Sequence, residues 1–297
     1  MTTAKIEPGP DTGLDIGELS RPGGVGIRCQ GVVHLYRTFE GHDVVALQGV
    51  DLTIEPGERV AFLGPSGSGK STLLTLLGGI QKPSAGRIFL GEEEISRMGE
   101  RFLARIRTRR VSTMLQGSTR NLLPYATGRQ NIAFARLALT SSERRGVLPD
   151  TDLLRRVGLE EQADQVVSTM SGGQRQRLAL ACAVSTSPQL LLADEPTSQL
   201  SHEDRDHVIE LIHQLGDDLG TTIVVVTHQP EVAATFPRTV TMKGGRVGAE
   251  GVVHLPTHLA AEWPQGTLVR IEPEDVDRLV VSRPSDRDVI VPGEAHP

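Results

Sequence analysis

Eight residues with a characteristic spacing point to a binding site for phosphate groups. Residues 64–71 read GPSGSGKS, which matches the pattern G-x-x-x-x-G-K-[ST] and stands between the strand-like residues 59–63 and the helical run TLLTLLGG. Glycines let the backbone wrap closely so that its N–H groups face phosphate oxygens, and the following helix adds the partial positive charge of its N-terminus. We therefore expect a P-loop in which Lys70 contacts the β- and γ-phosphates and the Ser71 hydroxyl is a ligand of Mg²⁺.

Two adjacent carboxylates follow a second strand-like run. The sequence LLLADE at residues 190–195 is apolar until it reaches Asp194 and Glu195. Because side chains alternate along a strand, we expect the two carboxylates to point in different directions. Asp194 is then placed to hold the Mg²⁺ shell, and Glu195 to polarise the attacking water as a general base. The alternative is a helix cap, since a proline and a threonine follow, but a P-loop in the same chain favours catalysis.

A second glycine-containing helix start suggests another site for an anion. Residues 171–177 read SGGQRQR and lead into the helical run LALACAV. Together with the P-loop and the acidic pair, this segment resembles the signature motif of ABC-type ATPases, and the resemblance covers residues 27 to about 250. In that family two cassettes pair head to tail, so each ATP lies between the P-loop of one and the signature of the other. The resemblance therefore implies a second cassette, identical or different, as a partner.

Further positions match the family one by one. Tyr36 stands 28 residues before Gly64 and matches the aromatic residue that stacks on adenine, although a core tyrosine is the competing interpretation. Gln116 matches the residue that senses the γ-phosphate and Mg²⁺ and contacts the membrane subunit, and His228 matches the histidine that holds the γ-phosphate.

The resemblance thus assigns three sets of residues. Those with catalytic roles are Glu195, His228, Lys70 and Gln116. Those expected to hold Mg²⁺ are Ser71, Gln116 and Asp194. Those expected to bind ATP are Tyr36, Gly64, Pro65, Ser66, Gly67, Ser68, Gly69, Lys70, Ser71, Thr72, Ser171, Gly172, Gly173 and Gln174.

Two positions depart from the family pattern. Met170 stands before the signature where leucine is usual, which is a volume-conserving change. Ser201 stands where the family has an aspartate that helps couple the two ATP sites across the dimer. The resemblance therefore implies that the change at Ser201 affects the coupling between the two ATP sites, while every residue expected to carry out hydrolysis is present.

Composition restricts the class of protein. The 297 residues carry 37 acidic and 31 basic side chains, a formal net charge of −6, so we expect no nucleic-acid partner across the whole surface. No apolar run approaches the ~18 residues that span a bilayer, and the N-terminus shows no secretion or organelle signal, which predicts a cytoplasmic location. The two cysteines are far apart between apolar or small residues, which indicates buried, reduced thiols.

The patterning along the chain predicts an α/β fold. Continuous apolar runs such as residues 190–193 and 222–226 are typical of a parallel sheet that is buried on both faces. We expect a disordered tail over residues 1–26, the cassette over 27–250 with a helical subdomain at about 91–158, and a partly disordered extension over 251–297. The resemblance specifies this as an ABC-type P-loop NTPase with a mostly parallel core sheet, an antiparallel β subdomain and an inserted helical subdomain. For the extension, a β-rich appendage, a dimer-stabilising arm and a tail all remain open.

The stretch that begins ALQGVDLTI, together with RRVSTMLQGSTRNLLP, resembles the branch of ABC ATPases that serve lipoprotein release, macrolide export and cell division. The resemblance implies a subunit held on the cytoplasmic face of the membrane by a separate integral-membrane permease, which in this family usually determines the substrate. Transport and mechanical work in the cell envelope are both open. A soluble ABC ATPase acting on ribosomes or DNA is less favoured, because such proteins have tandem cassettes or a long coiled coil. An inactive regulatory module has Ser201 as its only support.

Overall fold

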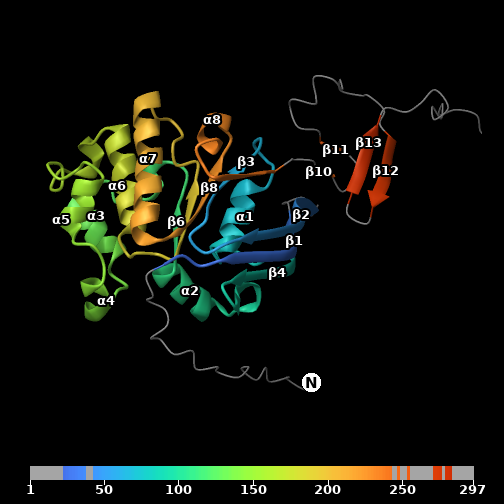
Figure 1. Ribbon diagram of the computed structural model, residues 1–297, viewed down its shortest axis with the longest axis horizontal. Helices are drawn as coiled ribbons and strands as arrows, with labels where there is room; N and C mark the ends of the chain where they lie inside the picture. Colours follow the sequence, from blue (N-terminus) through green and yellow to red (C-terminus); the bar gives the residue numbers. More distant parts are fainter. Residues whose placement is uncertain are drawn as a thin grey trace, which may run out of the picture. The chain divides into compact units, whose positions relative to one another are not determined.

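The computed structural model describes residues 23–37, 43–242, 246–247, 253–254, 270–275 and 278–282. The chain divides into two compact units, whose helices and strands are labelled in Figure 1. The first unit comprises residues 23–25, Pro56–Glu58 and Glu100–Ile223, and the second comprises Gly26–Glu55, Arg59–Gly99 and the chain from Val224 onward.

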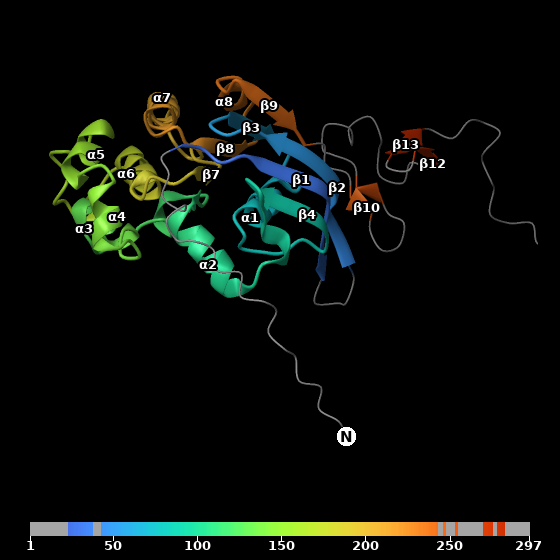
Figure 2. The ribbon, with the colours of Figure 1, turned by 60° about the horizontal axis from the view of Figure 1, so that its bottom comes forward.

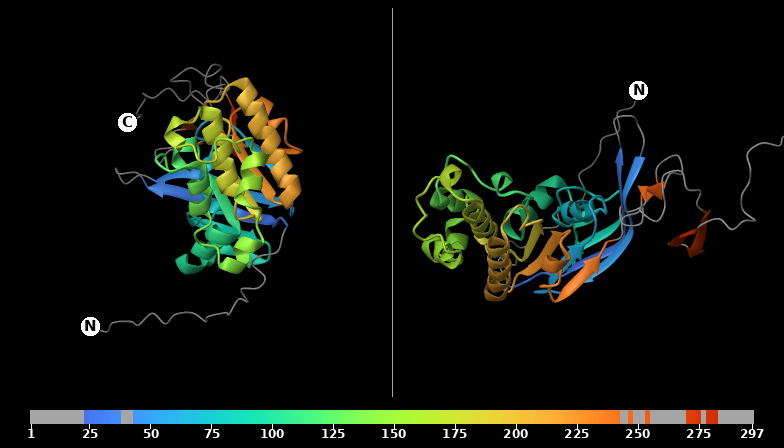
Figure 3. Two further views of the ribbon diagram at one scale, coloured as in Figure 1. Left: turned by 90° about the vertical axis from the view of Figure 1, so that its left-hand side faces the viewer. Right: turned by 90° about the horizontal axis from the view of Figure 1, so that it is seen from above.

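The first unit is built from helices around two parallel strands. Strand β6 (Val111–Met114) pairs in parallel with β7 (Leu190–Asp194), and Met114 lies opposite Ala193. The remaining elements of this unit are α2 (Glu100–Arg109), η3 (Ser118–Arg120), α3 (Gly128–Ala135), α4 (Ser141–Arg145), α5 (Asp150–Arg156), η4 (Val167–Thr169), α6 (Gly172–Val184) and α7 (His202–Leu219). Helices α3, α5 and α6 pack against one another, and α7 runs alongside α6 (Figure 3).

Local sequence signals start and stop the two longest helices of this unit. Ser171 is the N-cap of α6 and forms a capping box, because its hydroxyl accepts from the Gln174 N–H while the Gln174 side chain accepts from the Ser171 N–H. Ser201 is the N-cap of α7, and its hydroxyl accepts from the Asp204 N–H. Helix α7 ends at Gly220, whose φ of 63° is a conformation that glycine adopts without strain.

A buried arginine ties three helices of the first unit together. Arg136, at the end of α3, donates to the carbonyls of Ser185 (2.9 Å) and Leu148 (2.7 Å) and forms an ion pair with Asp150. Burial lowers the pKa of Arg136, and the Asp150 carboxylate opposes that shift. Since a guanidinium stays charged in proteins, its burial is stable only with these partners.

The second unit contains an antiparallel sheet in the order β2-β1-β4-β5, and Figure 2 shows β1, β2 and β4 side by side near α1. Its strands are β1 (Ile27–Arg37), β2 (Asp43–Ile54), β4 (Ala85–Leu90) and β5 (Glu93–Glu94). In the same unit β3 (Arg59–Leu63) pairs in parallel with β9 (Arg238–Thr241), and the strand on the other side of β3 is β8 (Thr222–Thr227). The remaining elements are α1 (Lys70–Leu77), η2 (Ile95–Arg97), α8 (Pro230–Ala233), β10 (Arg246–Val247), β11 (Val253–His254), β12 (Arg270–Asp275) and β13 (Arg278–Ser282).

The predicted fold class is confirmed. The strands expected over residues 59–63, 190–193 and 222–226 appear as β3, β7 and β8, and the parallel and antiparallel sheets are both present. All six residues of β8 and the first four of β7 are buried, as the continuous apolar runs indicated. Among the described residues, no helix combines the length and the apolar character that crossing a bilayer requires.

The domain boundaries remain predictions. The expected tail falls mostly outside the described residues, but Val25, near its end, is buried and bonded through its N–H to the Gln189 carbonyl. The range 91–158 contains α2 to α5 and also strand β6. Of the extension, the structure describes β11 and the antiparallel pair β12–β13, and its other residues lie outside the described part.

The two thiols should be unreactive in the folded protein. Burial raises the pKa of Cys182 to about 12, and burial with a smaller contribution from Asp51 raises that of Cys29 to about 12. Because the thiolate is the nucleophile, we expect no alkylation of native protein by iodoacetamide at pH 8, and two modifications in denaturant, counted by mass spectrometry. Equal labelling rates in native and denatured protein would contradict the burial of both thiols.

Candidate active site

The P-loop has the geometry of a phosphate-binding loop. It connects the end of β3 at Leu63 to the start of α1 at Lys70. Gly67 and Gly69 have φ values of 81° and 89°, in the left-handed region that other residues rarely adopt. A Cβ atom on Gly69 would lie 2.5 Å from the Ala46 carbonyl oxygen of β2. The close approach of this loop to β2 therefore depends on glycine.

Lys70 is a buried cation held by the loop itself. Its side chain is 6% exposed, and Nζ donates to the carbonyls of Gly64 (2.6 Å) and Pro65 (2.8 Å). The first turn of α1 contains no acidic residue, and Gly69 offers no side chain to cap the helix. The N-terminal N–H groups and the ammonium thus form a positively polarised end of the kind that binds phosphate.

Tyr36 is not a core residue. It is 39% exposed, its hydroxyl lies 3.3 Å from Thr72 Oγ1, and it donates to Gln81 Oε1 at 3.1 Å. Its ring meets the ring of His34 edge to face at 4.7 Å between centroids. Gln81, which comes shortly after α1, was not among the residues predicted from the sequence, and it helps to hold the tyrosine against the start of that helix.

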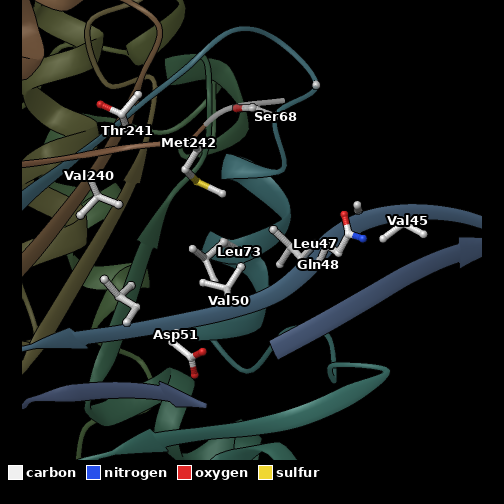
Figure 4. Close-up of a pocket in the computed structure, with 13 residues that line it drawn as sticks. Val45, Leu47, Gln48, Val50, Asp51, Ser68, Leu73, Val240, Thr241 and Met242 are labelled. Atoms are coloured by element: carbon white, nitrogen blue, oxygen red, sulfur yellow. The ribbon is translucent and has the colours of Figure 1, made fainter. Parts of the chain in front are cut away.

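A pocket of about 310 Å³ lies beside the P-loop within the second unit (Figure 4). One side is formed by β2, with Val45, Leu47 and Gln48, and another by the loop residue Ser68. The chain after β8 closes it with Val240, Thr241 and Met242. Tyr36 does not line this pocket. His228, the other predicted residue of this unit, is exposed and directly follows β8.

The acidic pair lies where β7 ends. Asp194 is the last residue of the strand, and Glu195 is 8% exposed with φ of 48°. The expected alternation of the two side chains therefore stops at Asp194, and a left-handed turn sets the direction of Glu195. The alternative of a helix cap is excluded, because α7 begins at His202 with Ser201 as its cap.

Gln116 leaves the sheet at the same edge as the acidic pair. Met114 ends β6 opposite Ala193 in a parallel pairing, so the two strands end side by side, with Asp194 as the last residue of β7 and Gln116 shortly after β6. The Asn121 side chain accepts from the Leu115 N–H (2.8 Å) and donates to the carbonyls of Leu115 (2.8 Å) and Gly117 (3.0 Å). This clamp around Gln116 was not predicted from the sequence. The one feature that could have indicated it is an asparagine in a loop, because such side chains often form hydrogen bonds with nearby backbone groups.

The signature glycine Gly173 contacts the first turn of α7. A Cβ atom there would lie 2.2 Å from Asp204 Oδ1, so only glycine fits without moving that carboxylate. The Ser201 hydroxyl lies 3.1 Å from Asp204 Oδ2 as well as accepting from its N–H. Serine therefore keeps the helix cap that an aspartate would also provide, without the charge.

The predicted residues divide between the two units. Tyr36, the P-loop with Thr72, and His228 belong to the second unit. Gln116, the signature with Ser171 and Gln174, Asp194 and Glu195 belong to the first. Of the three residues predicted to hold Mg²⁺, Ser71 belongs to the second unit, and Gln116 and Asp194 belong to the first.

Comparison with known proteins supplies the decisive observation. A family model described as ABC transporter matches residues 47–198, which is more than half of the chain and runs from within β2 to just beyond the acidic pair. This chain belongs to the ABC transporter family. The predicted ABC-type ATPase is thereby confirmed, while the roles of individual residues remain predictions.

Its relatives within the ABC transporter family include two from the predicted branch. The lipoprotein-releasing system ATP-binding protein LolD 1 of Caulobacter vibrioides is 37% identical over 222 residues, which cover 74% of this chain and 94% of that protein. The macrolide export ATP-binding/permease protein MacB of Rhodopirellula baltica is 40% identical over 226 residues, 75% of this chain and 33% of MacB. A dimeric structure of the ATP-binding cassette MJ0796, in a post-hydrolysis state with ADP and Pi, is 33% identical with a TM-score of 0.63, covering 73% of this chain and 94% of that one.

The tight P-loop gives a direct test of the nucleotide site. Gly69→Ala places a methyl group against the Ala46 carbonyl and strains φ, so we expect the free energy of unfolding to fall by about 2 kcal/mol and ATP binding to be lost. The matched control is Gly99→Ala, which meets no atom within 4 Å and should cost only a few tenths of a kcal/mol. Denaturant titration and binding of a fluorescent ATP analogue measure both effects. Parent-like binding by Gly69→Ala would contradict the proposed loop geometry.

Proposed function

We propose that this chain is the ATP-hydrolysing cassette of a membrane complex, works as a dimer of cassettes, and drives a separate integral-membrane permease from the cytoplasmic side. The observation that carries this is the P-loop with its buried, loop-held Lys70 at the uncapped start of α1. Within the first unit, the paired ends of β6 and β7 add Gln116, Asp194 and Glu195 at one edge.

ATP binding is assigned to the second unit. The backbone N–H groups of the P-loop and Lys70 bind the phosphates, and Ser71 and Thr72 at the start of α1 add hydroxyl groups. Tyr36 is exposed and is held by Thr72 and Gln81, which supports its role as a platform for the adenine ring.

The residues proposed for the metal site fit Mg²⁺ by their chemistry. Ser71 offers a hydroxyl, Gln116 an amide oxygen and Asp194 a carboxylate, and such oxygen ligands suit a hard cation that also takes ligands from water and phosphate. When bound, Mg²⁺ neutralises charge on the β- and γ-phosphates. The chain's own contribution is to fix two of these groups at neighbouring strand ends and the third at the start of α1.

Hydrolysis is assigned to Glu195 as general base, with His228 holding the γ-phosphate. The Glu195 carboxyl group is largely withdrawn from solvent, in a turn that fixes its direction. A carboxylate in such a position can accept a proton from an attacking water without first reorganising a solvent shell.

The dimer follows from the two helix starts. The chain has one P-loop but a second polarised helix N-terminus at the signature, and the dimeric MJ0796 cassette supports pairing of two such chains. In the proposed dimer, Ser171 to Gln174 face the ATP held by the P-loop of the other copy. Because two anion sites then share one ATP, its binding favours closure.

Exposed apolar side chains on α3 and on the residues that flank it, here called the α3 surface, support docking of a permease. Phe134 and Leu137 are 56% and 64% exposed, and Tyr125, which shortly precedes α3, is 77% exposed. Asn131 of α3 accepts from the Leu123 N–H (2.7 Å) and donates to the Leu123 carbonyl. The segment between Gln116 and α3 is thus tied down near both ends by an asparagine, which supports transmission of movement between Gln116 and α3.

The relative MacB supports this kind of partner, because its name joins an ATP-binding part to a permease. We propose no nucleic-acid partner, since the net charge is −6.

Replacement of the base should separate binding from turnover. We expect Glu195→Gln to bind ATP like the parent, to hydrolyse it at least roughly 100-fold more slowly, and to form an ATP-dependent dimer in size-exclusion chromatography. Lys70→Ala should lose both binding and hydrolysis, because it removes the phosphate contact. A parent rate of hydrolysis by Glu195→Gln would rule out Glu195 as the base.

The permease should copurify through the α3 surface. We expect tagged Glu195→Gln protein, incubated with membranes, ATP and Mg²⁺, to retain a multi-helix membrane protein in near-equal amount, identified by mass spectrometry. Phe134→Ser with Leu137→Ser should lose it. Ile80→Ser, at an apolar residue of the second unit that is 47% exposed, is the matched control and should retain it. Recovery of ribosomes or DNA instead would contradict the proposed partner.

A further inference from the structure

Glu195 has a backbone conformation that its own residue type does not favour. Its φ of 48° lies in the left-handed region, where a side chain with a Cβ atom is strained. Such a conformation persists only where the surrounding structure imposes it. Contacts around Glu195 must therefore hold its backbone in the left-handed conformation.

The turn itself provides only part of the answer. The Ser198 N–H donates to the Glu195 carbonyl at 3.1 Å, and the Leu200 N–H reaches the Thr197 carbonyl at 3.4 Å. Gln199 is a second left-handed residue in the same turn, with φ of 68°. These two backbone hydrogen bonds help to hold the two strained residues, and proline at position 196 has no N–H to donate.

A side chain from the signature helix holds the residue that follows Glu195. Gln176 lies in the second turn of α6, is 4% exposed, and donates from Nε2 to the carbonyl oxygen of Pro196. Pro196 is itself buried, so this hydrogen bond is shielded from water. A bond in such surroundings is costly to break, because water does not replace the lost partner.

We propose that Gln176 is a positioning residue for Glu195, a role that rests on the proposed function of that carboxylate. By fixing the Pro196 carbonyl, the Gln176 amide keeps the preceding residue left-handed and its carboxyl group aimed as a base. Gln176 stands five residues after the signature N-cap Ser171 on the same helix. Any displacement of the signature end of α6 therefore reaches the base of the same chain through one hydrogen bond.

The first test is a comparison of kcat with KM in Gln176→Met, which keeps the volume and removes the donor. We expect kcat to fall roughly 10- to 100-fold, because a small displacement of a base has effects of that size. KM for ATP and binding of a fluorescent ATP analogue should stay within about twofold, since Gln176 is assigned no contact with the nucleotide.

The matched control is Arg177→Met on the same helix. Arg177 Nη1 donates to the carbonyls of Val157 (2.9 Å) and Gly158 (3.1 Å), so the change also removes bonds from an α6 side chain to a backbone. We expect a lower melting temperature with kcat within about twofold of the parent. An equal loss of kcat in both variants would assign Gln176 a merely structural role and overturn the proposal.

A double variant separates positioning from an independent effect. In the Glu195→Gln background, Gln176→Met should cause no further loss of residual hydrolysis, whereas independent contributions would multiply. Parent-like kcat in Gln176→Met, or multiplication in the double variant, overturns the proposal while the function of Glu195 stands. If Glu195→Gln is as active as the parent, the proposed function fails instead.

Gln176→Glu tests the same hydrogen bond should the methionine variant not fold. Its carboxyl group donates to the Pro196 carbonyl only when protonated, and burial raises the pKa of such a group. The ratio of its kcat to that of the parent should therefore rise as the pH is lowered from about 8 to about 6. A ratio that does not change with pH would overturn the proposal.

Discussion

The complete burial of the central strands constrains where this protein can place polar chemistry. All residues of β8 and most of β3 and β7 are shielded from solvent, so a polar side chain is stable there only with a hydrogen-bond partner. Thr222 and Thr227, at the two ends of β8, have such partners, and the residues between them are apolar. The residues proposed for function lie where strands stop: the P-loop after β3, Asp194 at the end of β7, and His228 after β8.

The N-termini of α1 and α6 are capped differently, and the difference matches their proposed functions. The start of α6 is closed by a capping box, which fixes the signature in one conformation and uses the Gln174 N–H internally. The start of α1 follows a left-handed glycine without a side-chain cap, and its lysine is folded back on the loop carbonyls. The first arrangement gives rigidity, while the second leaves backbone donors for a phosphate.

Amide side chains that form hydrogen bonds with the backbone recur beside residues of the proposed site. Asn121 holds the residues on either side of Gln116, Asn131 holds Leu123, and Gln176 holds Pro196. Each of these side chains supplies a hydrogen bond that a loop, unlike a helix or a strand, does not provide for its own backbone. These three amide side chains thus hold backbone segments beside residues of the proposed site.

The sequence by itself determined the elements and the chemistry of this protein. Glycine spacing, the strand ending in two carboxylates and the helix starts are local properties, so the P-loop, β7 and α6 could be predicted with their residues. The left-handed backbone at Glu195, the amide clamps, and the contact of Gly173 with Asp204 were decided only by the tertiary structure. The contacts of Gln176 with Pro196 and of Gly173 with Asp204 join residues that are far apart along the chain, and no periodicity or local propensity records them. The clamps made by Asn121 and Asn131 are more local, spanning four to eight residues, but the sequence does not say which backbone groups they reach. The sequence shows which side chains are present in a motif, but only the packing of the folded chain decides which backbone atoms those side chains contact.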